Sequence, residues 1–319
     1  MSAYRPLNEA AIEAYDIQRV GGVAAETTPA DVISGFTAAE EAHGLLEELQ
    51  GVVGSGQSVD IELLTGAQVR VREPRLSPEV RFGVLLRDQR YLDPAAYVAA
   101  LAESVRARGG KIIEQTPVIS VARRGTAVVA RTADGDIDAD AVVLANGAWL
   151  STLAAPHGVT LPVHAGRGYS FTLPTAEPLR QPVHFPATRI ALTPAGDRVR
   201  VVGIMEFADP DAPLAQTRIQ SMITALRPLV TGLDWDGRAN DWVGPRPLTT
   251  DGVPLVGPYR DPRCLCRWRQ WHVGCHSRTG DRATPRRASR HRTHTTRIRA
   301  AQSIALMSRR RCDDGKQPS

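Results

Sequence analysis

Cysteine, long apolar runs and aromatic residues are scarce in this 319-residue sequence. All four cysteines lie at or after Cys264, so residues 1–263 cannot form a disulfide framework. No apolar run approaches the roughly 18–20 residues of a membrane-spanning helix. The first residues, MSAYRPLNEAAIEAYD, lack an apolar core after a basic start, which argues against a secretory signal. We therefore expect a cytoplasmic protein without a transmembrane segment.

Charge divides the chain into two unequal parts. Residues 264–319 contain 13 Arg and one Lys against three Asp, whereas residues 1–263 carry a net charge of −6. Although the Arg-rich part could bind phosphates, it lacks a recognisable nucleic-acid-binding module, so we expect no specific nucleic-acid partner. Cys264, Cys266 and Cys275-His276 have a spacing that is poor for structural zinc, and we expect no metal.

Local sequence patterns predict an α/β fold. Residues 7–50 are rich in Ala, Leu and Glu and are predicted to be mainly helical. Asp93, followed by proline, is a typical N-cap of a further helix. Residues 141–145 (AVVLA) form a continuous apolar run, typical of a strand buried on both faces. Residues 161–245 alternate as antiparallel strands, with a helix near Gln216–Leu226, which predicts a second, β-rich domain.

Three stretches carry a family resemblance, namely DQRYLDPAAYVAALAESVRARGG, DADAVVLANGAWL and WVGPRPLTTDGVPLVGP. With them the sequence resembles the FAD-dependent D-amino-acid oxidase superfamily, and within it D-amino-acid dehydrogenases and glycine oxidases. The likeness covers roughly residues 8–263. It implies an incomplete FAD/NAD(P)-binding-type flavoprotein domain beside an antiparallel β-rich substrate domain. It also implies FAD as cofactor, an amino acid or amine as substrate, and oxidation of the substrate C–N bond.

The same resemblance suggests where the domains begin and end. Five segments are expected: 1–92, a helical and substrate-domain segment; 93–160, a segment of the FAD-binding domain; 161–240, the β-rich substrate domain; 241–263, a return to the FAD domain; and 264–319, a disordered tail.

Two residues are expected to act on the substrate. Arg246 stands where the family binds the substrate carboxylate, and a planar guanidinium suits a carboxylate better than an ammonium does. The alternative for Arg246 is a surface arginine in a proline-rich turn. Tyr169 falls in a stretch that borders the substrate pocket in the family. The alternative for Tyr169 is a core tyrosine with a satisfied hydroxyl.

The expected cofactor contacts are mostly backbone contacts. Val118 matches the position whose main chain meets the adenine in the family. Ala145, Asn146, Gly147 and Trp149 match the turn that packs on the dinucleotide, where small residues allow close approach. Asn146 departs from the pattern, because the family usually has a small residue there.

Both ends of the sequence depart from the family pattern. The G-x-G-x-x-G motif that binds the pyrophosphate at a helix N-terminus is missing, so we expect the chain to begin after that segment. From residue 264 on we expect an out-of-frame translation. Read one base forward, codons for Cys266–Ala288 can give V-G-G-G-N-G-M-W-G-V-T-L-G-P-A-T-G-R-L-L-A-E, which is similar to the family's flavin-binding run. DNA sequence across the Arg263 codon tests this.

Two functional hypotheses follow. In the first, the chain is an FAD-dependent oxidoreductase impaired by truncation. In the second, it is a non-catalytic remnant or an associating subunit of a split flavoprotein. A complementary chain would then carry the dinucleotide-binding motif.

Overall fold

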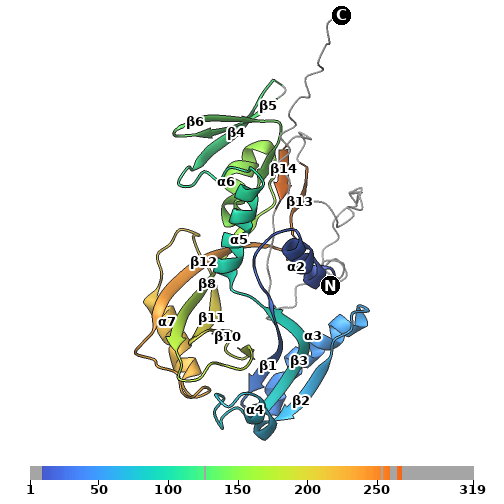
Figure 1. Cartoon of the computed structure of the whole chain (residues 1–319), viewed down its shortest axis with the longest axis vertical. Helices are drawn as coiled ribbons and strands as arrows, with labels where there is room; N and C mark the ends of the chain where they lie inside the picture. The colour runs from blue at the N-terminus through green and yellow to red at the C-terminus, as the bar shows by residue number, and fades with distance from the viewer. Residues whose placement is uncertain (1–8, 126, 253, 259–263, 268–319) are drawn as a thin grey trace, which may run out of the picture.

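An eight-stranded mixed sheet organises most of the chain in the computed structural model, which describes residues 9–125, 127–252, 254–258 and 264–267 (Figure 1). The strand order is β12-β8-β11-β10-β9-β1-β3-β2, and all neighbours are antiparallel except β1 and β9. The strands are β1 (Thr28–Phe36), β2 (Ile61–Thr65), β3 (Phe82–Tyr91), β8 (Val163–Pro174), β9 (Val183–Phe185), β10 (Ile190–Ala195), β11 (Arg198–Phe207) and β12 (Ala239–Thr249).

Two three-stranded sheets lie at the other end of the molecule (Figure 1). One is an antiparallel meander of β4 (Val118–Arg124), β5 (Ala127–Thr132) and β6 (Gly135–Ala139). The other places β14 (Cys264–Arg267) between β13 (Val256–Pro258) and β7 (Val142–Leu144), with β14 parallel to β7. The mixture of helices and sheets confirms the predicted α/β class, and strands β8–β12 of the large sheet form the predicted β-rich part.

Helices cover the sheets and connect them. The α-helices are α2 (Ala11–Val20), α3 (His43–Gly54), α4 (Gly66–Arg72), α5 (Pro94–Ala107), α6 (Leu150–Ala154) and α7 (Gln216–Leu226), and the 3-10 helices are η1 (Ala39–Ala42), η2 (Gly147–Trp149) and η3 (Ala155–His157). Among the residues that the structure describes, none of the helices combines the length and apolar character that crossing a bilayer requires.

The large core lies on one face of the eight-stranded sheet. Residues of α7, such as Ile219 and Met222, pack there against strand residues such as Phe171, Leu192 and Val201. A separate cluster packs α3 against Phe36 and Val84. A third cluster joins β4, β5 and β7 to α6. The site described below is built around this third cluster and the adjoining end of β8 and β12.

Two sequence predictions differ from the structure. The segment 7–50 is not mainly helical throughout, because β1 occupies its middle, paired with β3 and β9 from distant parts of the chain. Strand β7 is not buried on both faces: Val143 is 50% exposed, while Leu144 faces α6. The expected boundary at residue 264 stays a prediction; residues 264–267 form β14, which pairs with β7. The remaining tail, with Cys275 and His276, lies outside the described residues.

Candidate functional site

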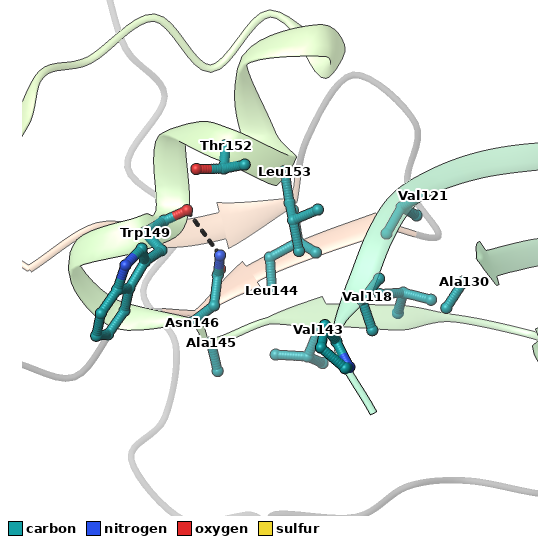
Figure 2. A pocket seen from close by; sticks show the side chains of 12 residues that line it. Val118, Val121, Ala130, Val143, Leu144, Ala145, Asn146, Trp149, Thr152 and Leu153 are labelled. Carbon is teal, nitrogen blue, oxygen red and sulfur yellow. Dashed lines mark hydrogen bonds between the residues drawn. The ribbon is translucent and has the colours of Figure 1, made fainter. Parts of the chain in front are cut away.

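A hollow of about 630 Å³ opens between β4, β7 and the short helix α6 (Figure 2). Its lining residues are Pro117, Val118, Val121, Ala130, Val142, Val143, Leu144, Ala145, Asn146, Trp149, Thr152 and Leu153. Four of the five residues expected to contact a cofactor, Val118, Ala145, Asn146 and Trp149, are therefore in the lining. They come together because β4 and the end of β7 face the same cluster of apolar side chains below α6.

The walls of the hollow are mainly apolar, with one unusual polar group. Asn146 donates its Nδ2 hydrogen to the main-chain oxygen of Trp149, 2.8 Å away (Figure 2). Its Oδ1 is buried and has no hydrogen-bond partner among the described residues. A buried acceptor without a partner costs about 1–3 kcal/mol. The hollow thus suits a flat, largely apolar group that brings a hydrogen-bond donor to Asn146.

Gly147 brings this hollow next to the large sheet. Its φ is +62°, a left-handed conformation that favours glycine. Among the described residues, a Cβ placed on Gly147 would come within 4 Å of Pro247 Cγ only, at 3.9 Å. Pro247 belongs to β12, one residue from Arg246. The turn at residues 145–149 and the strand that carries Arg246 are therefore neighbours.

Arg246 lies on the face of the sheet opposite the large core. It pairs with Gly166 of β8, and the next pair on that face is Gly244 with Gly168. A Cβ on Gly168 would lie 3.3 Å from both Cζ and Nη2 of Arg246. Because Gly168 has no side chain, the guanidinium lies directly against the backbone of β8.

Large apolar side chains share this face with Arg246. Met205 pairs with Gly168, and Phe207 pairs with Gly166, on the side of β8 away from β12. Phe207 is 69% exposed and Trp242 is 55% exposed. The end of the face around Arg246 therefore places its guanidinium among aromatic and thioether groups, which suits a planar or carboxylate-bearing ligand.

Tyr169 does not lie with Arg246. It pairs with Val243, so its side chain is on the core face of β8, where it is 1% exposed. Its hydroxyl donates to Glu206 Oε1 at 2.5 Å. Burial, and then the hydrogen bond to Glu206, raise the pKa of Tyr169, while that hydrogen bond lowers the pKa of Glu206. The geometry supports the core alternative for Tyr169.

Asp211 is a site residue that the sequence patterns do not indicate. The Trp149 indole Nε1 donates to both of its carboxylate oxygens, at 3.2 and 3.1 Å. Asp211 lies between β11 and α7, far from Trp149 in sequence. The only local signal is the polar, proline-containing stretch ADPDAP, which indicates a turn but no partner.

Comparisons with known proteins agree on one protein family for this chain. The model of the family described as FAD dependent oxidoreductase matches residues 2–285. A D-amino acid dehydrogenase of Rhizorhabdus wittichii is 29% identical over 229 residues, which are 70% of this chain and 55% of the relative. One from Cereibacter sphaeroides is 38% identical over 165 residues, 50% of this chain and 37% of the relative. The chain thus spans about half the length of the curated relatives it matches.

Solved structures show the same fold. A glycine oxidase from Bacillus cereus superposes with a TM-score of 0.72 at 19% identity, covering 85% of this chain and 74% of the other. A glycine oxidase from Geobacillus kaustophilus gives a TM-score of 0.70 at 23% identity, covering 84% and 71%.

Proposed function

The chain belongs to the FAD-dependent oxidoreductase family, and from this premise we propose that it serves the oxidation of the C–N bond of an amino acid. The proposal follows the D-amino acid dehydrogenases among its relatives. When bound, FAD would supply the two-electron oxidation. The substrate would lose a hydride equivalent from its α-carbon and a proton from its amine, and water would convert the resulting imine to a keto acid and ammonia. We further propose a cytoplasmic location, which cell fractionation with an antibody to the chain tests.

One observation carries this proposal: the close approach of Gly147 to Pro247, which joins the hollow to the strand of Arg246. A cofactor that occupies the hollow would therefore extend toward the open face of β8 and β12. A substrate held on that face would present its α-carbon to the same cofactor. Proximity of this kind is what a hydride transfer requires.

The residues of the hollow fit part of a flavin dinucleotide. Its apolar walls suit the adenine ring, and the buried Oδ1 of Asn146 could accept a hydrogen from the adenine amino group. Ala145 and Gly147 leave room for the dinucleotide to approach the backbone, and Trp149 closes one side. Val118, at the start of β4, borders the same hollow. Tyr169 is left out of the proposed substrate contacts because it faces the core.

Arg246 would hold the substrate. Its guanidinium donates two parallel hydrogens, so it can bind a carboxylate in a fixed orientation. The neighbouring apolar groups would pack beside the substrate while its carboxylate pairs with Arg246. The protein's contribution would thus be to orient the α-carbon, and no side chain needs to take part in the redox chemistry.

Titration of the purified chain with FAD tests the proposal. We expect bound flavin, with absorption bands near roughly 370 and 450 nm, and anaerobic bleaching of the longer-wavelength band by amino acids. Arg246→Met should raise the amino acid concentration for half-maximal bleaching by about tenfold or more. The matched control is Arg131→Met, an exposed strand arginine in β5. If both variants bind FAD and need the same amino acid concentration for half-maximal bleaching, Arg246 does not hold the substrate.

A second candidate is the associating subunit of a split flavoprotein. Within the part of the chain that the structure describes, β7 is an edge strand with Val143 exposed, and the sequence contains no G-x-G-x-x-G. An edge strand can accept a strand from another chain. Co-expression with a strand–G-x-G-x-x-G–helix polypeptide tests this candidate. It predicts co-purification and flavin binding that neither chain shows alone.

A further inference from the structure

The loop between β11 and α7 is fixed from within by a tight turn. Asp209 accepts the Asp211 main-chain hydrogen on its Oδ1 at 2.8 Å, and its main-chain oxygen accepts from the Ala212 nitrogen at 3.1 Å. An aspartate that caps a turn in this way restricts the backbone two residues further on. The Asp211 side chain is thereby presented from a defined backbone position.

A buried arginine holds the same loop to the large sheet. Arg167 of β8 donates to the main-chain oxygens of Ala212 and Pro213, the second at 2.9 Å. Its side chain is 3% exposed, and its charge is balanced by Glu206 at 3.5 Å. Because a buried cation needs such partners, the loop cannot move away from β8 without leaving Arg167 unsatisfied.

Glu206, which pairs with Arg167, is itself held by two further side chains. It accepts the Tyr169 hydroxyl hydrogen at 2.5 Å and the Arg218 Nε hydrogen at 3.0 Å. The loop is consequently tied to β8, β11 and α7 at once. Asp211 stands on the outer side of this anchored loop, where its carboxylate meets Trp149.

Trp149 has few other constraints on its side chain. It ends the three-residue helix η2, which has no side-chain cap, and it is 40% exposed. Yet its ring forms part of the wall of the hollow (Figure 2). The hydrogen bond to both oxygens of Asp211 is thus the contact that selects one orientation of the indole.

We propose that Asp211 is a positioning residue, which holds the Trp149 indole as a wall of the cofactor hollow from a loop anchored by Arg167. The identity of the ligand, a flavin dinucleotide, rests on the proposed function. The position of the indole does not, so the two can be tested apart. Asp211 is not in the lining of the hollow and would act through Trp149.

The test follows the indole directly. In ¹H–¹⁵N spectra, the Nε1 resonance of Trp149 is assigned with Trp149→Phe. We expect it to exchange with solvent more slowly than that of the exposed Trp242. Asp211→Ala should abolish this protection, whereas Asp211→Asn, which keeps one oxygen acceptor, should retain it. Asp236→Ala, at an exposed aspartate in another loop, is the matched control and should leave the resonance unchanged.

FAD titration gives the second readout. Asp211→Ala should weaken FAD binding about 5- to 10-fold, the loss of one charge-assisted hydrogen bond, and Asp211→Asn should stay within about twofold of the parent chain. An unchanged indole resonance in Asp211→Ala overturns the inference, as does equal loss in the Asn variant. If the parent chain binds no FAD, the proposed function fails, and the indole resonance still decides the role of Asp211.

Discussion

Gly147 shows how a single backbone conformation can shape a site. Its φ of +62° is strained for a residue with a side chain, but within the part of the chain that the structure describes a Cβ there would meet only Pro247, at ordinary contact distance. We expect Gly147→Ala to lower the free energy of unfolding by about 1 kcal/mol, because strain alone sets the cost. Gly54→Ala in α3, where a Cβ meets no described residue within 4 Å, should leave the free energy of unfolding unchanged or raise it by about 0.5 kcal/mol. Urea unfolding of both variants measures this. Equal effects would contradict the expectation.

His184 makes stability depend on pH. It lies in β9, between Ser34 of β1 and Ala191 of β10, and burial lowers its pKa from 6.5 to about 4. The unfolded chain therefore binds a proton between these values that the folded chain does not. Neutral His184 therefore contributes fully to the free energy of unfolding above pH 6.5. As the pH falls toward 4 this contribution is lost, which lowers the free energy of unfolding by about 3 kcal/mol.

Urea unfolding across this pH range checks the role of His184. We expect His184→Gln to flatten the pH dependence of the unfolding free energy. His43→Gln is the control, because that histidine is 78% exposed and should leave the slope as it is. A slope that survives in the His184 variant would show that other groups cause it.

Among the secondary-structure elements, those with local signals were predicted well. Asp93 caps α5, and α7 spans Gln216–Leu226 as expected. Strand β1 was missed because the feature that makes it a strand is pairing with β3 and β9, which come from distant parts of the chain. For β7 the strand was predicted but not its burial, since burial depends on which elements cover each face.

The candidate site was predictable to the extent that its residues belong to one motif. Ala145, Asn146 and Trp149 are close in sequence, and they line one hollow with Val118. Tyr169 could not be assigned in this way. Side chains alternate between the two faces of β8, but the face that Tyr169 shares or does not share with Arg246 depends on the register between β8 and β12, which the sequence does not give. Asp211 depends on a contact between distant segments, which no local pattern indicates.

The N-terminus of α5 offers a test at the same scale. Asp93 accepts hydrogens from the main-chain nitrogens of Ala95 and Ala96, at 2.8 and 3.2 Å. We expect Asp93→Ala to lower the free energy of unfolding by about 1 kcal/mol, while Asp93→Asn should lose only a few tenths. Urea unfolding again gives the measurement. A variant with Ala that is as stable as the parent chain would show that α5 does not depend on its cap.

At the scale of the whole molecule, the large core and the cluster of β4, β5, β7 and α6 stabilise different parts of the chain. The eight-stranded sheet shares its core with α7, whereas the meander β4–β5–β6 contributes to a small cluster with β7 and α6. Strand β6 is almost entirely exposed. Local opening is easiest where few apolar groups are buried. The meander end is therefore expected to open while the large sheet stays closed.

Hydrogen exchange measured by mass spectrometry tests this division. Peptides from β10 and β11 should exchange last and those from β4–β6 first, even though both sheets have regular backbone pairing. Leu192→Ala, in the large core, should cost about 3 kcal/mol and speed exchange in the large sheet. Leu153→Ala, the matched leucine of the small cluster, should instead speed exchange in the meander and α6. Equal effects of the two variants on both regions would mean that the molecule unfolds as one cooperative unit. In that case the hollow could not open unless β12, the strand that carries Arg246, also unfolded.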